Sequence, residues 1–177
     1  MTDLLANWTG ALTTAVGAVV DVAYEPTHHT DAAALLTCFY FPGTTVGELG
    51  EVLALTDSGA VRLVNRMERA GLLRRDARRG RVVTLRATGD GRRLALDLQA
   101  RRLRAIDSLF SSLTTDERAQ LAGLLHKVLG GVEFGGRQAR QTCRHCDHRR
   151  CDGEVCPIGQ RLRDQGELAP RVGKAGV

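Results

Sequence analysis

The stretch LTDSGAVRLVNRMERAGLLRRDARRGRVVTLR, residues 55–86, decides the fold that we predict for this chain. It reads as a capped helix, a tight stop, a strand, a basic turn and a second strand. Thr56 is placed to act as the N-cap, because a threonine hydroxyl accepts a hydrogen bond from an early backbone N–H of a helix. Gly71 is placed to end the helix, since glycine adopts the left-handed conformation at little cost.

The two faces of this predicted helix differ in chemistry. At about 100° per residue, the apolar face carries Ala60, Leu63, Val64 and Met67. The polar face carries Ser58, Arg62, Asn65 and Arg69, with Arg66 at its edge. Hydroxyl, amide and guanidinium groups read base edges and hold phosphates in a DNA groove. The alternative interpretation is a surface helix whose polar face is only solvated.

The distribution of charge favours the DNA-binding interpretation. The chain has a net charge of +5, and residues 62–86 contain nine arginines against Glu68 and Asp76. That stretch therefore carries +7 and the rest of the chain −2. A basic patch confined to one structural unit is typical of a nucleic-acid footprint.

Length and composition indicate a globular protein of the cytoplasm. With 177 residues, 43% of them hydrophobic and 25% charged, the chain is long enough for one domain with appendages. The stretch 4–22 is apolar, but its polar residues and the lack of a basic start favour a core helix over a membrane or signal segment. In a reducing cytoplasm, clustered cysteines indicate metal or redox chemistry before structural disulfides.

Helical spacing and capping signals predict the remaining elements. We expect helices over residues 3–22, 30–38, 46–53, 90–110 and 115–128. Thr45 with Glu48, and Thr114 with Glu117, have the spacing of capping boxes. The three-residue connection 54–56 joins two short helices as in a helix-turn-helix. Strands near residues 72–75 and 81–86 would form a hairpin whose tip, with Arg78, Arg79 and Arg81, contacts the minor groove or phosphates, unless it is only a solvated loop.

These features resemble the MarR family of bacterial transcription regulators. The resemblance rests on residues 45–91, above all on the pattern L-T-x-S-G-x-x-R-L-V-x-R-x-E-x-x-G-L-x-R-R, and on residues 113–129. It covers about residues 1–130. It implies a homodimer that binds a pseudo-palindromic duplex with half-sites about 34 Å apart. Family members commonly repress transcription and are released by a small-molecule effector, a metal or oxidation.

The resemblance implies a mainly α fold with a small two- or three-stranded β-wing, a winged helix-turn-helix dimerised through its terminal helices. By position, the DNA contacts would be Thr56, Ser58, Ala60, Arg62, Asn65, Arg66 and Arg69 on the helix, and Arg78, Arg79 and Arg81 on the wing. An Asp–Arg pair involving Asp76 would hold the wing in shape. We divide the chain into a dimerisation helix (1–29), the DNA-binding domain (30–88), further dimerisation helices (89–130), a four-cysteine tail (137–160) and a disordered end (161–177).

The tail departs from the family. Cys143, Cys146, Cys151 and Cys156 follow the spacing C-x2-C-x4-C-x4-C, that of a zinc knuckle with cysteine in place of histidine and with Asp147 where a glycine usually stands. Four thiolates at this spacing can hold one tetrahedral zinc. An iron–sulfur cluster and a thiol–disulfide switch are the alternatives. The site can sense metal or redox state, or it can be a structural staple.

The remaining candidate residues have plain interpretations. Cys38 is expected to be buried and inert, with a redox sensor as the alternative. His28, His29, His145 and His148 are expected to be exposed, with metal ligands as the alternative. An effector cleft between the dimer helices and the winged domain would be lined by Trp8, Tyr24, Phe39 and Phe41, although these can equally be core residues. No catalytic set is recognisable, so we do not expect an enzyme. A metal- or redox-handling protein that uses the winged helix for protein contact is the alternative function.

Overall fold

The computed structural model describes residues 2–76, 83–151 and 155–166. Its elements in chain order are α1 (Thr2–Tyr24), α2 (His29–Tyr40), β1 (Thr44–Thr45), α3 (Val46–Leu53), α4 (Asp57–Arg69), β2 (Leu73–Arg75), β3 (Thr84–Ala87), α5 (Gly89–Ser108), α6 (Thr115–Gly131), α7 (Gly136–Thr142) and α8 (Pro157–Asp164). The predicted fold, mainly α with a small β-wing, is confirmed. No helix among the described residues is both long and apolar enough to cross a membrane.

The core of the winged domain is built around α2. This helix buries a continuous set of small and branched side chains, from Ala32 to Leu36 and again at Cys38. Helices α3, α4 and α5 and strand β3 pack around it, with Leu49, Met67, Leu85 and Leu98 in the same cluster. A helix that is apolar on most sides is buried in this way because every face removes apolar surface from water.

Local signals set the element boundaries as expected. The hydroxyl of Thr56 accepts a hydrogen bond from the Gly59 N–H at 3.2 Å, and both predicted capping boxes form. Gly71 follows α4 and has a φ of +71°, the left-handed conformation predicted for the residue that ends this helix. Gly91 lies where α5 passes β2 so closely that a Cβ atom would stand 2.0 Å from the Leu72 carbonyl oxygen.

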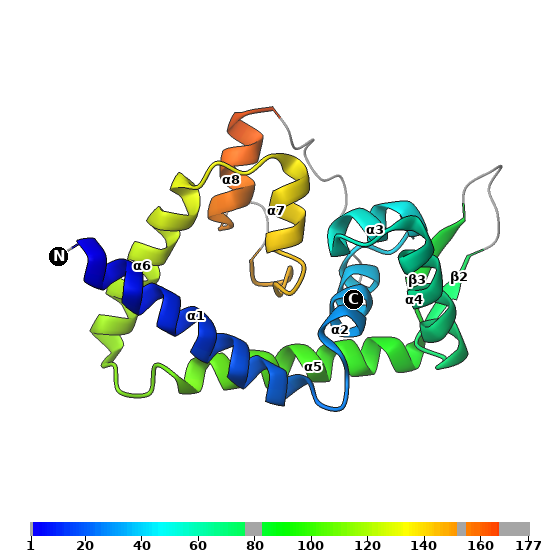
Figure 1. Ribbon diagram of the computed structural model, residues 1–177, viewed down its shortest axis with the longest axis horizontal. Helices are drawn as coiled ribbons and strands as arrows, with labels where there is room; N and C mark the ends of the chain where they lie inside the picture. The colour runs from blue at the N-terminus through cyan, green and yellow to red at the C-terminus, as the bar shows by residue number, and fades with distance from the viewer. Residues whose placement is uncertain (1, 77–82, 152–154, 167–177) are drawn as a thin grey trace.

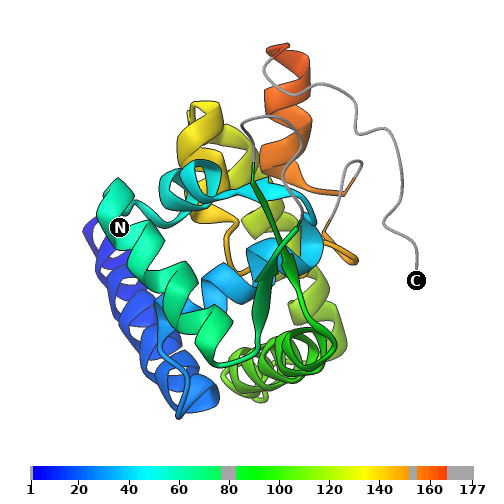
Figure 2. The ribbon, with the colours of Figure 1, turned by 90° about the vertical axis from the view of Figure 1, so that its right-hand side faces the viewer.

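Three short strands form the wing sheet, in the order β1-β3-β2. Both pairs are antiparallel, with Thr44 opposite Leu85 and Arg74 opposite Arg86. Viewed along α5, the strands lie beside α4, and α7 stands against α3 at the other end of the domain (Figure 2).

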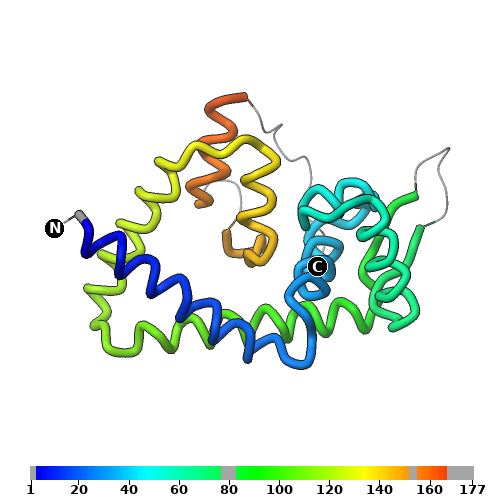
Figure 3. The backbone as a smooth tube through the Cα atoms, viewed as in Figure 1, coloured from blue at the N-terminus to red at the C-terminus, as the bar shows by residue number. Residues whose placement is uncertain are grey.

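The molecule has an arm and a winged domain, joined by the long helix α5 (Figure 3). Helix α1 packs along α5, and α6 rises from the far end of the arm (Figure 1). Helices α7 and α8 then fold back, so that the tail lies between α6 and the pair α2 and α3 (Figure 1). Residues 161–164 belong to α8, so the expectation that disorder begins at residue 161 is wrong.

Candidate nucleic-acid interface and cysteine cluster

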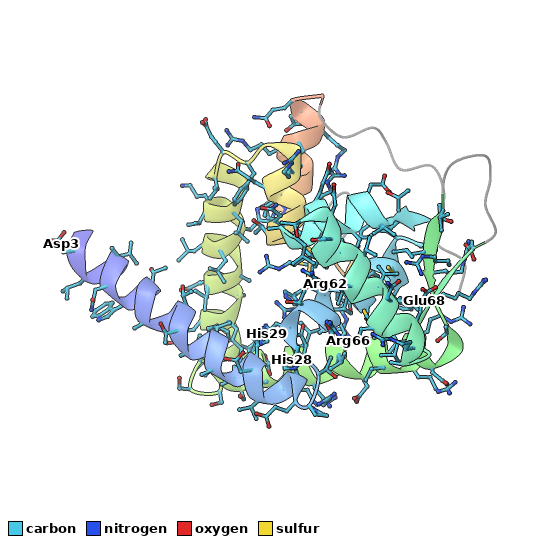
Figure 4. The ribbon with its side chains drawn as sticks, turned by 45° about the vertical axis from the view of Figure 1, so that its right-hand side comes forward. Asp3, His28, His29, Arg62, Arg66 and Glu68 are labelled. Atoms are coloured by element: carbon cyan, nitrogen blue, oxygen red, sulfur yellow. The ribbon has the colours of Figure 1, made fainter. Side chains whose placement is uncertain are left out.

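The polar face of α4 is exposed as its spacing predicted. Ala60, Leu63, Val64 and Met67 are buried against the core. Thr56, Ser58, Arg62, Asn65, Arg66 and Arg69 are all exposed. Figure 4 shows Arg62, Arg66 and Glu68 along this helix. The helix therefore presents a hydroxyl, an amide and three guanidinium groups on one surface.

Ala60 does not belong to that surface, contrary to the prediction. Its side chain is 1% exposed and lies at the crossing of α3 and α4. A Cβ atom on Gly50 would stand 3.2 Å from the Ala60 Cβ. The two small residues let the helices of the helix-turn-helix approach closely, so Ala60 shapes the motif and presents nothing to a groove.

The remaining polar residues of α4 differ in how firmly they are held. Arg66 pairs with Asp31 of α2 through two hydrogen bonds, the longer of them 3.2 Å from Nε. Asn65 accepts a hydrogen bond from Arg75 of β2 at 3.0 Å, and Arg75 also pairs with Glu68. Arg62 makes no hydrogen bond or ion pair with any residue that the structure describes. It is the guanidinium group most available to an external acceptor.

Asp76 fixes the base of the wing. Its carboxylate pairs with Arg74 at 2.9 Å and Arg86 at 3.0 Å, one on each strand of the hairpin. This is an Asp–Arg arrangement of the predicted kind, with strand arginines as the partners. The predicted contacts Arg78, Arg79 and Arg81 lie outside the described residues.

The four tail cysteines gather at one place. Cys143 ends α7 and Cys156 caps the start of α8. The Cys143 thiol is in hydrogen-bond contact with Cys146 and Cys156, and Cys156 contacts Cys151. No disulfide joins them. Hydrogen bonds from the Cys143 thiol and the Gly159 N–H, the latter 3.2 Å from Cys156 Sγ, lower the pKa of Cys156.

The loop between these cysteines is anchored to the winged domain. Asp147, only 5% exposed, accepts hydrogen bonds from the Tyr40 hydroxyl at 2.9 Å and from Arg149. The Nδ1 atom of His145 lies 3.0 Å from the Tyr24 hydroxyl. Sequence reasoning missed Tyr40 and Tyr24 as tail partners. The one signal was Asp147 in the place of the usual glycine, because an acid there needs donors.

The tail histidines are not exposed as expected. His145 stacks near Tyr24 and His29, with ring centroids 5.5 and 5.9 Å away. Burial, and then the charges of neighbouring arginines, lower the pKa of His145 to about 3, so its ring is neutral. His148 packs on Tyr40 and Phe41, with ring centroids 5.3 and 4.8 Å away.

The tail also occupies the place where an effector cleft was expected. A cavity of about 100 Å³ remains there, lined by His29, Thr30, Ala33, Leu53, Arg144 and His145. Pockets for drug-sized ligands usually measure about 300–1,000 Å³. Tyr24 is fully buried and Trp8 is 64% exposed on the arm, so these two aromatics do not line a shared cleft.

Cys38 is buried as predicted. Its side chain is 1% exposed within the core around α2. Burial raises the pKa of this thiol to about 12. The thiol is therefore protonated at neutral pH and has little reactivity.

A capped recognition helix, a close-packed preceding helix and a three-stranded wing define a winged helix-turn-helix of the DNA-binding class. Comparisons with known proteins agree. Residues 29–82 match the sequence model of the MarR family. No curated protein matches the chain. Over these residues the chain resembles the MarR family of winged helix-turn-helix transcription regulators.

Solved structures show the same fold. A MarR family protein from Bacillus stearothermophilus is 27% identical, with a TM-score of 0.58 over 72% of this chain and 89% of that one. The PcaV transcriptional regulator from Streptomyces coelicolor is 28% identical, with a TM-score of 0.55 over 70% and 93%. The apo form of MarR from E. coli is 22% identical, with a TM-score of 0.60 over 71% and 96%.

Proposed function

We propose that the protein is a dimeric repressor that binds a pseudo-palindromic operator through α4 and the wing. The observation that carries the proposal is the exposed polar face of α4, where Arg62 has no hydrogen-bond or ion-pair partner among the described residues while Asn65 is held in place by Arg75. The Asn65 amide, held in one orientation, lies on the same face as the available Arg62 guanidinium. This arrangement suits base readout, because hydrogen bonds to base edges require defined geometry.

Unpartnered apolar surface on the arm supports dimerisation. Leu4, Leu5, Trp8 and Leu12 of α1 are exposed, and so are Leu124, Leu125, Val128 and Leu129 of α6. Helix α6 buries no residue within the chain. Contiguous exposed apolar side chains mark an interaction surface, and a two-fold partner would cover both helices at once. Two recognition helices would then face successive major grooves.

The decisive experiment is DNA binding by an Arg62→Ala variant. Loss of a bidentate base contact should cost about 1–3 kcal/mol on the operator and much less on random duplex. Specific affinity, measured by fluorescence anisotropy on the upstream region of its own gene, should fall roughly 10- to 100-fold.

Arg104→Ala is the matched control, since Arg104 is an exposed arginine of α5. It should leave the ratio of specific to random binding unchanged. If Arg62→Ala and the parent discriminate equally well between operator and random duplex, α4 is not the reading element and the proposed function is wrong.

A further inference from the structure

The proposed DNA-binding function gives no role to the cysteine cluster. Its four sulfur atoms come from a chain segment of fourteen residues that turns back on itself, so that the first and last cysteines touch. The Cys146 N–H donates to the Cys143 carbonyl at 2.9 Å, and the Cys151 N–H donates to the Asp147 carbonyl at 2.8 Å. These tight turns bring the cysteines near one another.

The backbone around the cluster suits sulfur carrying negative charge. Cys156 stands at the N-terminus of α8, where the Gly159 N–H donates to its Sγ. The exposed side of the loop carries Arg149 and Arg150, which both pair with Asp147. N–H donors and nearby arginines stabilise thiolates, which are the form that binds metals.

The side chains of the cluster are not arranged as a coordination sphere. Within residues 2–76, 83–151 and 155–166, no group of three or more His, Cys, Asp or Glu side chains is arranged to hold one. Coordination would therefore draw the sulfur atoms together, and such a movement would reach the residues that the loop contacts.

The loop and α7 contact α1 of the arm and helices α2 and α3 of the winged domain. His145 meets Tyr24 of α1, Asp147 meets Tyr40 of α2, and Gln141 donates to the Glu51 carbonyl of α3 at 2.9 Å. Arg140 adds an ion pair to Glu51 at 3.5 Å. Helix α3 packs directly on α4, so a displacement of the loop reaches the recognition helix through one intervening helix.

We infer that Cys143, Cys146, Cys151 and Cys156 bind one zinc ion, and that binding shifts α3 and α4 through the contacts at Tyr40 and Glu51. Each coordinating thiol that is still protonated gives its proton to solvent as its Zn–S bond forms, and a cysteine already present as thiolate binds without releasing one. The closed site carries a charge of −2, one dication against four thiolates. The regulatory half of this inference rests on the proposed function; the metal site does not.

The site is tested first by metal uptake of the full chain, purified without oxygen and stripped with a chelator. Co²⁺ should bind at one equivalent, with thiolate-to-cobalt charge-transfer bands and the d–d bands of a tetrahedral site, and Zn²⁺ should displace it. Cys143→Ser and Cys156→Ser should each abolish these bands. Cys38→Ala, the control, should keep them.

A second measurement does not depend on how the variants fold. In the parent protein, one equivalent of Zn²⁺ should protect the four tail thiols from alkylation, as read by mass spectrometry of the modified peptides. Absence of uptake and of protection overturns the site. So does a brown protein containing iron and sulfide, or a tail already joined by disulfides.

The coupling is tested by comparing DNA affinity with and without Zn²⁺. Allosteric coupling of the usual size should change operator affinity by roughly 5- to 150-fold. Tyr40→Phe removes the hydroxyl that holds Asp147, so it should keep the cobalt spectrum and reduce that change.

The outcomes separate the two claims. Unchanged operator affinity on zinc loading overturns the coupling while DNA binding stands. Failure of both the stripped and the loaded protein to bind any operator refutes the proposed function, and also the coupling, but leaves the metal site to the cobalt titration.

Discussion

Ala54, in the turn between α3 and α4, is a residue in an unfavourable conformation. It has a φ of 54° and a ψ of 40°, the left-handed region that side chains other than glycine enter at a cost. The turn tolerates it because Leu55 N–H donates to the Gly50 carbonyl at 2.9 Å and because the helices on both sides are packed. The strain is the cost of a three-residue connection.

Ala54→Gly should therefore stabilise the protein. We expect the free energy of unfolding to rise by about 0.5–1 kcal/mol, because relief of the strain exceeds the entropy that glycine loses on folding. Chemical denaturation measures this. Ala70→Gly is the control at an exposed position with ordinary helical angles, and it should destabilise by about 0.5–1 kcal/mol. A loss of stability in Ala54→Gly would show that the turn is not strained.

The role of a single residue could be predicted from the sequence where that role depends on neighbouring residues in the chain. Thr56, Gly71 and Glu117 have the roles that their types and spacing predicted, because caps depend on a few neighbouring atoms. Ala60 was assigned both to the apolar face by periodicity and to the DNA face by family position, and only burial decided between them. The partners of Tyr24 and Tyr40 lie 121 and 107 residues away, beyond any local pattern.

Helix α6 begins at one of the two predicted capping boxes. It buries no residue within the chain, so its first turn relies on the box formed by Thr114 and Glu117. The Glu117 carboxylate accepts from the Thr114 N–H and hydroxyl, both at 2.8 Å. The backbone hydrogen bond first, and then the hydroxyl, lower the pKa of Glu117.

This lowered pKa predicts a pH dependence. A group with a depressed pKa in the folded state contributes stability above its unfolded pKa and loses it as pH falls through the folded value. The stability gap between the parent and Glu117→Ala should therefore be present at pH 7 and narrow below about pH 4.

Thermal unfolding followed by circular dichroism measures this gap. Asp116→Ala, which removes the neighbouring carboxylate and leaves the capping box in place, is the control for the loss of one negative charge. A gap for Glu117→Ala that stays constant from pH 7 to pH 3 would contradict the role of the box.

For the whole molecule, the apolar surface of the arm is the feature that the proposed dimer would cover. Helices α1 and α6 expose apolar side chains there, with Leu5 68% and Leu124 61% exposed. Spacing predicted both helices, but which residues meet across a dimer is set by a second chain, and no pattern within one chain specifies that geometry.

Leu124→Asp should separate the dimer. An unpaired carboxylate buried at the interface costs about 3 kcal/mol or more, so dimer affinity should fall roughly 100-fold or more. Light scattering after size-exclusion chromatography measures the mass. His126→Asp, on the opposite face of α6 at about 100° per residue, should remain dimeric. A Leu124→Asp variant of unchanged mass would place the interface elsewhere.

The folded-back tail also changes how a free ligand meets the winged domain. The surface around Tyr24 and Tyr40 is held by a segment of the same chain, which acts as a tethered competitor. Competitors on short flexible tethers have effective concentrations in the millimolar range. A ligand for that surface would therefore bind with an apparent Kd raised by about the ratio of the tail's effective concentration to the tail's own Kd for the surface. A small molecule can bind this surface only while the tail is displaced from it, so tail displacement limits both the rate and the extent of binding.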